Sequence, residues 1–438
     1  MKTKTIFTTA AIAISMSFAS CSKEHDGTQG KIDEGKPTYM GISFTVPANS
    51  NAVTRATTDP NATEAEAAFK FVDVFIYNPA TGSQVKHARI SANEFDGPVA
   101  GSSSDEWTMK ATAKIASTTG PKTIILGVNL SQSLSNALEG VSMGAFTTVA
   151  QSVNVADVTG SADGFAMFST APLNVTLVAD PDQNNPKAQV QRLVAKVTVQ
   201  KSENMSVSAA GTIGNLMFVL NNTNKKTFYV QPVDKKDHNW ETTPAGDLAS
   251  SNTNYVAVNE YGVALKSLNP GYALENTTRD FFMGQVTRVT VRATFIPAEI
   301  KVFTNNTDNT DGYTDQAVTA TTPATFYSIM YNGGADRAYF FNLAVANAFA
   351  ADNSATVVTY NDGLCYWDMF LNVDNATGPY DVIRNDFYRC NITRIIGPGR
   401  NTPELVDPSL PPSAETELTV DIDIVYWNPI QKDYVLEP

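Results

Sequence analysis

The residue with the clearest chemistry in this sequence is Cys21, which follows Phe18-Ala19-Ser20. Small residues directly before a cysteine are what lipoprotein signal peptidase requires, and the sulfur of that cysteine then carries a diacylglycerol. The chain before it has a basic start, Met1–Lys4, and an apolar stretch, residues 6–18, that is too short to span a bilayer stably. We therefore expect residues 1–20 to be a lipoprotein signal peptide and Cys21 to be lipidated; an ordinary secretory signal with an incidental cysteine is the alternative.

Arg55 is a lone arginine among small residues, in Val53-Thr54-Arg55-Ala56. It lies in a segment, residues 48–58, that follows Pro47, and because Pro47 stops the strand-like residues before it, we predict an exposed loop. Such a loop is open to proteolysis between Arg55 and Ala56; an ordinary, unprocessed surface arginine is the alternative. Residues 22–36 are polar and charged, which predicts a flexible tether.

Cys365 and Cys390 are the two cysteines that remain once Cys21 carries lipid. An even pair of cysteines in an exported protein favours a disulfide. Closing the loop between them would contribute roughly 3 kcal/mol of stability. Two buried free thiols are the alternative, and the pair is structural in either case.

Other motifs that could indicate catalysis or metal binding lack the residues or the context that such sites require. Gly140-Val141-Ser142-Met143-Gly144 matches the nucleophile-elbow pattern, but polar residues precede it where a buried strand is needed. Of the two histidines after Arg55, His87 and His238, only His238 has the chain order that this motif requires. The histidines are too scattered for a zinc site, and no Gly-rich phosphate loop is present. We expect a protein that is not an enzyme and binds no metal or cofactor.

Composition and charge narrow the class further. The net charge is −13, which disfavours nucleic acid and anionic membranes as partners. Charged residues make up only 17% of the chain, whereas Thr, Asn, Ala and Val are abundant, a mixture typical of β-rich extracellular proteins. No apolar run after Cys21 approaches the length of a membrane-spanning helix.

Hydrophobic periodicity predicts short strands separated by turns, which favours sandwiches over parallel α/β units. Short helices are expected at residues 131–140 and 144–155. A polar break at 221–226 places a domain boundary at Asn224. The predicted strands are residues 40–46, 69–77, 122–129, 190–199, 287–295, 386–396 and 418–427.

The strands nearest the two ends have similar apolar faces. Ile42, Phe44 and Val46 alternate with polar residues near the N-terminus. The C-terminal strand has the cleanest alternation in the chain and follows a Gly- and Pro-rich segment, residues 397–412, which we expect to be a loose, extended leash. One face of it carries Leu418, Val420, Ile422, Ile424 and Tyr426, and the other carries Thr419, Asp421 and Asp423.

These two strands suggest an exchange between molecules. A cut after Arg55 would free strand 40–46 and leave a groove of apolar core and unpaired backbone groups. An extended peptide from another molecule can fill such a groove, and the C-terminal strand fits the pattern. Burying four or five such side chains contributes about 8–12 kcal/mol before ordering costs. The exchange is head-to-tail, so it predicts open filaments and not rings.

Several motifs, in this order and between these two termini, resemble Bacteroidia-type fimbrillins, the shaft subunits of type V pili, and among them most the major subunit of minor fimbriae. The resemblance covers essentially the whole chain. Besides the sequence around Cys21 and Arg55, it rests on Val74-Phe75-Ile76-Tyr77-Asn78, Arg192-Leu193-Val194-Ala195-Lys196-Val197, Tyr272-Ala273-Leu274-Glu275-Asn276, Tyr366-Trp367 and Tyr388-Arg389-Cys390-Asn391-Ile392-Thr393.

The resemblance implies an all-β protein of two transthyretin-like β-sandwich domains with a few short helices and exchangeable terminal strands. It further implies export by the lipoprotein machinery to the outer membrane, cleavage after Arg55 by an Arg-specific cysteine protease, and assembly into a surface fimbria. The partners implied are other copies of the chain, related pilus subunits, and host or bacterial surface ligands. The pair Cys365 and Cys390 is not a signature of the family.

The domain organisation that follows is a signal peptide at residues 1–20, a propeptide with the removable strand at 21–55, sandwich domains at 56–224 and 225–438, and a donor strand at 418–438. Two alternatives stay open. One is an accessory protein at the tip or anchor of a fimbria. The other is a glycan-binding surface lipoprotein, which exposed tryptophans at Trp107, Trp240 or Trp367 would favour.

Overall fold

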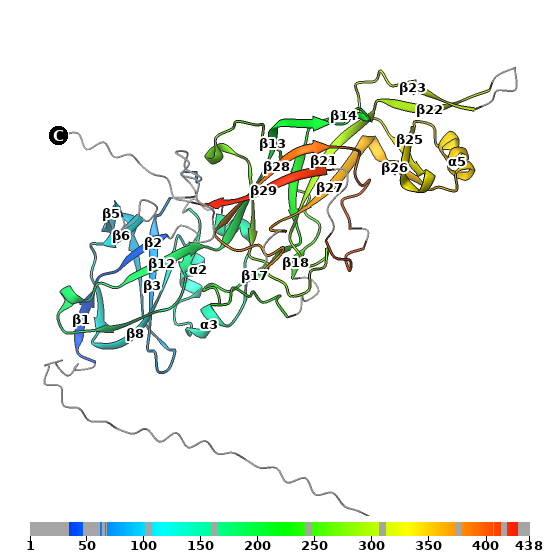
Figure 1. Cartoon of the computed structure of the whole chain (residues 1–438). Coiled ribbons are helices and arrows are strands. Elements are labelled where there is room, and N and C mark those ends of the chain that lie inside the picture. The colour runs from blue at the N-terminus through cyan, green and yellow to red at the C-terminus, as the bar shows by residue number, and fades with distance from the viewer. Residues whose placement is uncertain are drawn as a thin grey trace, which may run out of the picture.

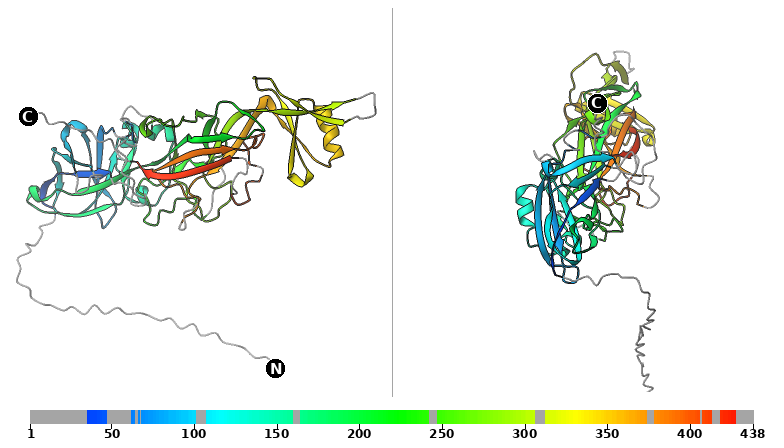
Figure 2. Two further views of the ribbon diagram at one scale, coloured as in Figure 1. Left: turned by 45° about the horizontal axis from the view of Figure 1, so that its top comes forward. Right: turned by 90° about the vertical axis from the view of Figure 1, so that its left-hand side faces the viewer.

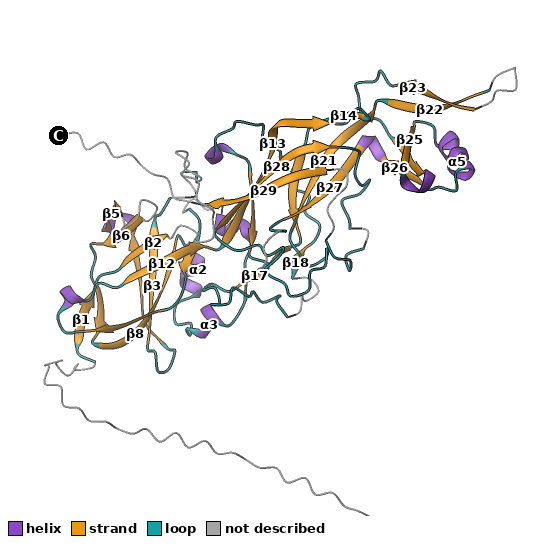
Figure 3. Ribbon diagram, viewed as in Figure 1, coloured by secondary structure: helices purple, strands orange, loops and turns teal. Residues whose placement is uncertain are grey.

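The protein is mostly β-sheet, as a computed structural model shows (Figure 3). Two groups of sheets and a small distal subdomain, residues 299–360, follow one another along the long axis of the molecule (Figure 2). The predicted all-β class is confirmed, while the transthyretin-like strand order stays a prediction. The residues that the structure describes are 35–46, 62–63, 66, 68–100, 107–159, 164–241, 247–305, 312–373, 378–405, 407–412 and 418–427.

The N-terminal group is built around a nine-stranded sheet with the order β4-β3-β8-β10-β12-β2-β6-β5, in which β11 also pairs with β8. Strand β1 pairs separately with β7. Its strands are β1 (Pro37–Met40), β2 (Ser43–Val46), β3 (Phe71–Tyr77), β4 (Gln84–Ser91), β5 (Phe95–Ala100), β6 (Trp107–Ala111), β7 (Ile115–Thr118), β8 (Gly120–Val128), β9 (Gln151–Ser152), β10 (Met167–Ser169), β11 (Leu173–Leu177) and β12 (Lys187–Arg192). Its helices are η1 (Ala92–Glu94), α2 (Gln132–Ala137), α3 (Gly144–Thr147), α4 (Val155–Thr159) and η2 (Pro181–Gln183).

The C-terminal group is a sandwich of a four-stranded sheet, β20-β13-β28-β29, and a five-stranded sheet of β14, β15, β19, β21 and β27. Residues of both sheets form one apolar core. The elements are β13 (Val194–Val207), β14 (Gly211–Ile213), β15 (Met217–Asn221), β16 (Thr223–Asn224), β17 (Lys226–Thr227), β18 (Leu248–Ala249), β19 (Val256–Ala257), η3 (Leu265–Ser267), β20 (Pro270–Leu274), β21 (Arg288–Pro297), β27 (Leu364–Phe370), β28 (Asp386–Ile395) and β29 (Leu418–Tyr426).

The distal subdomain, drawn in yellow in Figure 1, was not expected from the sequence. It has its own small core, formed where α5 packs on a three-stranded sheet of β24, β25 and β26. Asn342 caps α5 by accepting hydrogen bonds from two backbone N–H groups at its start. Its elements are β22 (Glu299–Thr304), β23 (Gly312–Ala317), β24 (Phe326–Tyr331), η4 (Asn332–Gly334), β25 (Asp336–Phe340), α5 (Leu343–Asp352) and β26 (Val357–Tyr360). The short helix η5 (Asn361–Gly363) then connects β26 to β27.

The change from one group of sheets to the other falls at Leu193. The predicted strand 190–199 is in fact two strands, β12 in the N-terminal sheet and β13 in the C-terminal one, joined at this single residue. The boundary predicted at Asn224 lies in β16, and the domain limits stay a prediction. No helix in the described part of the chain is long and apolar enough to cross a membrane.

Candidate functional site

The N-terminal strand β2 lies inside the large sheet and not at its edge (Figure 1). It runs parallel to β12, with Ser43 opposite Lys187, and antiparallel to β6, with Val46 opposite Trp107. Both of its hydrogen-bonding edges are therefore used. The predicted strand 40–46 is broken after Met40, because β1 pairs with β7 and β2 with β12 and β6.

The side chains of this segment complete the N-terminal core. Ile42 and Phe44 are 1% and 2% exposed and pack in the same cluster as residues of β3 and β8. The Phe44 ring makes edge contacts with Phe69 and Phe95, with centroid distances of 5.4 and 5.7 Å. The side chain of Val46 lies outside the described residues, as do Cys21, Arg55 and Ala56.

Hydrogen bonds from and to Asn184 also hold the segment of β1 and β2 in place. The side chain of Asn184 donates hydrogen bonds to the Thr38 hydroxyl at 3.2 Å and to the Tyr39 carbonyl at 3.0 Å. The Gly41 N–H donates to the Asn184 carbonyl at 2.8 Å. Removing β1 and β2 would leave Asn184, which is 3% exposed, without these partners.

The C-terminal strand β29 is paired within its own chain, as the edge strand of the four-stranded sheet. It runs antiparallel to β28, where Ile422 is opposite Cys390 and Val420 is opposite Ile392. Leu418 is buried in the C-terminal core, and Val420 and Ile422 are half-buried against it. The side chains of Ile424 and Tyr426 are outside the description, although their backbones pair with Tyr388 and Asp386.

The Gly- and Pro-rich segment before β29 is not the loose leash expected from its composition. Arg400 exchanges two backbone hydrogen bonds with Tyr366, at 2.8 and 2.9 Å, and its side chain pairs with Asp368 at 2.6 Å. Further along, the Leu410 carbonyl accepts a hydrogen bond from the Met283 N–H. As its Gly and Pro content indicates, the described part of this segment contains no named strand. The contacts of Arg400 and Leu410 nevertheless hold these two residues against the rest of the domain.

A buried polar cluster joins the end of β29 to the N-terminal sheet. We call Glu66, Arg192, Lys196, Tyr272 and Trp427 the Arg192 cluster. The fully buried Arg192 donates two hydrogen bonds to the Glu66 carbonyl, at 3.0 and 3.2 Å, and one to the Trp427 carbonyl, at 3.0 Å. Its guanidinium carbon lies 4.4 Å from the centroid of the Trp427 ring.

The Arg192 cluster holds two basic side chains, Arg192 and Lys196, around one carboxylate, that of Glu66. The Lys196 ammonium lies 2.8 Å from the Glu66 carboxylate, and the Tyr272 hydroxyl donates to the same carboxylate at 2.6 Å. Burial favours a raised pKa for Glu66, but the Lys196 ammonium and these hydrogen bonds hold that pKa below its ordinary value. Burial lowers the pKa of Arg192 to about 10 against the opposing charge of Glu66. Burial also lowers the pKa of Lys196, against the opposing charge of Glu66.

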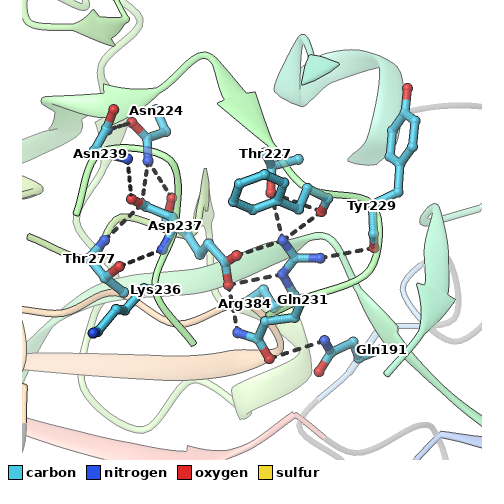
Figure 4. Close-up of polar contacts among 12 residues, drawn as sticks. Gln191, Asn224, Thr227, Tyr229, Gln231, Lys236, Asp237, Asn239, Thr277 and Arg384 are labelled. Carbon is cyan, nitrogen blue, oxygen red and sulfur yellow. Dashed lines mark hydrogen bonds and ion pairs between the residues drawn. The ribbon is translucent and has the colours of Figure 1, made fainter. Parts of the chain in front are cut away.

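A second buried network is centred on Arg384 and Glu275 (Figure 4). Arg384 forms a two-pronged ion pair with Glu275, at 2.6 and 3.0 Å, and both side chains are fully buried. Gln231 donates to the same carboxylate at 2.6 Å, and Gln191, the neighbour of Arg192 in β12, donates to Gln231 at 3.3 Å. The two groups of sheets thus meet through largely buried polar contacts.

Comparison with known proteins places this chain. Residues 358–433 match the family model of the major fimbrial subunit protein type IV, fimbrillin, C-terminal region. This stretch begins in β26 and contains β27, β28 and β29. The C-terminal region of the chain is therefore similar to the fimbrillins. The expected resemblance is thereby confirmed.

Solved structures of similar proteins come from Porphyromonas gingivalis and Parabacteroides distasonis, among others. A fimbrilin (FimA) from Porphyromonas gingivalis is 14% identical, with a TM-score of 0.48 over 90% of this chain and 99% of that one. A candidate cell adhesion protein from Parabacteroides distasonis is 17% identical, with a TM-score of 0.48 over 91% and 99%. The C-terminally truncated tip fimbrial protein from Porphyromonas gingivalis is 14% identical, with a TM-score of 0.39 over 89% and 100%. No curated protein matches this chain significantly in sequence.

The two core cysteines, Cys365 and Cys390, are free thiols, so the predicted disulfide is wrong for this structure. Cys365 lies on β27 and Cys390 on β28, which belong to different sheets, and each packs into the shared core. The Cys365 thiol donates to the Ala293 carbonyl at 3.3 Å, and burial raises the pKa of Cys390 to about 12. The apolar core stabilises this region without a covalent link.

His87 and His238 lie beside separate carboxylates. His87 lies 2.9 Å from the buried Asp73, and His238 lies 3.4 Å from Asp247. No cluster that could hold a metal ion is found among the residues described. Trp367 is fully buried in the C-terminal core and offers no glycan platform, whereas Trp240 is covered on one face by the Lys236 ammonium, 4.9 Å from its ring.

Sequence reasoning missed the Arg192 cluster as a site. Arg192 and Lys196 were recognised only as charged residues within an apolar strand. Two cations four residues apart in a segment that is otherwise buried require buried counter-ions, and this signal pointed to a partner such as Glu66. The sequence could not show which residue is that partner, because Glu66 lies 126 residues before Arg192 in the chain.

Proposed function

We propose that this protein is a structural subunit of a cell-surface fimbria and that it polymerises by protease-triggered strand exchange. The observation that carries the proposal is the contrast between its end strands. Strand β2 occupies the interior of a sheet and precedes Arg55, while β29, with a similar apolar alternation, is held along one edge only. One end is thus suited to leave a groove and the other to fill it.

Cleavage after Arg55 supplies the groove. Once the chain is cut, only non-covalent contacts hold β1 and β2, and their departure exposes the facing edges of β12 and β6. The apolar positions of Met40, Ile42 and Phe44, all at most 2% exposed, become empty sites along that groove. Main-chain hydrogen bonds would then give affinity, and these sites would select alternate apolar side chains.

The C-terminal strand supplies the donor. Val420, Ile422 and Ile424 repeat at the spacing of Met40, Ile42 and Phe44. A strand from one subunit entering the groove of the next uses two different surfaces, so the association is heterologous and builds an open filament. The donor must first leave β28, to which it is bound in the isolated chain.

Export and processing come before assembly in this proposal. Cys21 carries the lipid that holds the precursor in the outer membrane, and an Arg-specific extracellular protease releases the mature subunit at Ala56. The fimbria then supports adhesion to host or bacterial surfaces. Partners are other copies of the chain and related pilus subunits.

The test is limited trypsin treatment of the purified precursor, followed by N-terminal sequencing and electron microscopy. A new N-terminus at Ala56 together with fibres supports the proposal. Arg55→Ala is expected to give a folded monomer that forms no fibres, and Arg55→Lys, which trypsin still cuts, is the matched control that should restore them. Deleting residues 418–438 should give a processed subunit that does not polymerise.

Other outcomes would change the assignment. A chain that is cut at Arg55 and stays monomeric would contradict the shaft role and favour an accessory protein of the fimbria. Fibres from the Arg55→Ala variant, or from the chain that lacks residues 418–438, would contradict strand exchange itself.

A further inference from the structure

We propose that the Arg192 cluster is a latch that keeps β29 on its own subunit until β1 and β2 are released. This inference rests on the proposed function and concerns its regulation. In the uncut chain the latch would withhold the donor strand, and after the cut the groove and the donor would become available together.

The latch acts on the end of β29 that can open. An edge strand has one hydrogen-bonded neighbour and opens from its ends. Earlier in the chain, Arg400 and Leu410 are held by hydrogen bonds to Tyr366 and Met283, so opening from that side meets other contacts. At the opposite end Trp427, which directly follows the strand, is 2% exposed and packs in the junction between the two groups of sheets.

Trp427 is held by contacts on several sides. Its ring stacks on Tyr272 at a centroid distance of 5.8 Å with an interplanar angle of 15°, and it meets Phe165 edge-on at 5.7 Å. Arg192 lies over the ring and also donates to the Trp427 carbonyl. For β29 to peel away from this end, these aromatic and hydrogen-bonded contacts must break together.

Two direct connections run from β2 to the latch. The first is β12, which pairs with β2 through Lys187, Ala188 and Gln189 and ends at Arg192. The second is the chain itself, because Ala62 and Glu66 lie between Arg55 and β3. Ala62 is fully buried in the cluster of apolar residues that contains Trp427, and the Glu66 carbonyl accepts both hydrogen bonds from Arg192 described above.

Release of β2 therefore removes support from both sides of the latch. Strand β12 loses its parallel neighbour, and the chain that carries Glu66 loses its connection to β2. Once Glu66 moves, Lys196 loses the Glu66 carboxylate and Arg192 loses two hydrogen bonds to the Glu66 carbonyl. Buried cations without partners are unfavourable, so the latch is expected to open as a unit and not contact by contact.

Hydrogen exchange of the uncut chain, followed by mass spectrometry, tests whether the latch holds β29. Glu66→Gln keeps the side-chain volume but removes the charge that pairs with Lys196, and Trp427→Leu removes the ring. Each is expected to accelerate exchange of the β28–β29 amides by at least about tenfold relative to those of β3 and β8. The matched control is Asp423→Asn, which removes an ion pair on β29 itself and should change the rate by no more than about twofold.

The reference strands keep this test decisive. Unchanged β29 exchange in both Glu66→Gln and Trp427→Leu would overturn the latch. Equal acceleration in β3, β8 and β29 would mean a general loss of stability, and it would overturn the latch as well. None of these readings requires polymerisation, so they do not depend on whether fibres form.

The coupling to cleavage is tested on the wild-type chain after trypsin treatment and removal of the released peptide, at a dilution that keeps subunits apart. Exchange of the β29 amides should accelerate by at least about tenfold relative to β21 and β27. An unchanged rate would overturn the coupling even if fibres form at higher concentration. Accelerated exchange without fibres at higher concentration would support the latch and contradict the proposed strand exchange.

Discussion

Strands β2 and β29 have the same alternating apolar pattern but different positions in their sheets. Strand β2 lies between β12 and β6, and the side chains of Ile42 and Phe44 are almost fully buried. Strand β29 pairs with β28 alone, and Val420 and Ile422 are only half-buried. Because each hydrogen-bonded edge and each buried side chain adds stability, β2 is the more firmly held of the two.

This difference fits the role proposed for each strand. A strand with neighbours on both sides cannot leave without disrupting the sheet, so its release requires a cut in the chain. An edge strand can open and close reversibly, so a latch at one end is enough to control it. The same alternation in the sequence thus corresponds to two different barriers to release.

The largest effect that would sharpen this comparison is expected from Phe44→Ala. Removing a fully buried ring from the N-terminal core should lower the free energy of unfolding of the uncut chain by about 3–5 kcal/mol. Urea denaturation monitored by circular dichroism measures the loss. The control is Tyr39→Ala in β1, where the side chain is 52% exposed and the change should stay within about 0.5 kcal/mol. Equal losses in the two variants would contradict the buried position of β2.

A second effect, on the side of β29, depends on pH. Burial, followed by the nearby charge of Glu275, raises the pKa of Asp237 to about 7, and burial with the same charge raises that of Asp386, opposite Tyr426, to about 7 as well. Between pH 3.8, which is their ordinary pKa, and about pH 7, these two carboxyl groups bind more protons in the folded chain than in the unfolded chain. Stability from these groups is therefore greatest below that window and falls as the pH rises through it.

We expect the free energy of unfolding to fall by roughly 2 kcal/mol or more between pH 5 and pH 8 because of these groups. Asp386→Asn should reduce this fall in the free energy of unfolding with pH. Urea denaturation at several pH values between 5 and 8 measures the slope. Asp182→Asn, at a side chain that is 88% exposed, is the matched control and should leave the slope unchanged. A slope that Asp386→Asn does not reduce would contradict a protonated Asp386 in the fold.

Local patterns predicted the fold class and several of the longest strands, because alternation and turn residues can be recognised in neighbouring positions. The strand predicted at 386–396 is β28, and that predicted at 69–77 is β3 with two residues less at its start. The break between β12 and β13 was not visible, because Leu193 is apolar like its neighbours and only long-range pairing separates the two sheets.

Features that depend on tertiary contacts were beyond the sequence. The helix α5 is nearly uniformly apolar, LAVANAFAAD, so it lacks the periodicity that marks an amphipathic helix. The disulfide was expected from a count of cysteines, but the pairing of Cys365 and Cys390 depends on geometry that a count does not contain. The Arg192 cluster joins residues from four distant segments, and no local pattern connects all of them.

A smaller effect is expected from Val420→Ala in β29. The side chain is half-buried at the margin of the C-terminal core, so its truncation should lower the free energy of unfolding by about 1 kcal/mol, less than Phe44→Ala does. Val85→Ala, at an exposed position in β4, is the matched control with an expected change within about 0.5 kcal/mol. A loss as large as that of Phe44→Ala would mean that β29 is held as firmly as β2, and the comparison would fail.

The smallest effect is expected from Asp423→Asn. Its carboxylate pairs with Arg389 across β28 and β29 at 2.6 Å, but the two side chains are 50% and 27% exposed. Water and salt screen such a pair, so its loss should change the free energy of unfolding by no more than about 1 kcal/mol, and less in high salt. Urea denaturation at low and high ionic strength measures both. If this surface pair mattered more than Val420, β29 would be held by charge along its length, and the buried contacts of Trp427 would not be the ones that control its release.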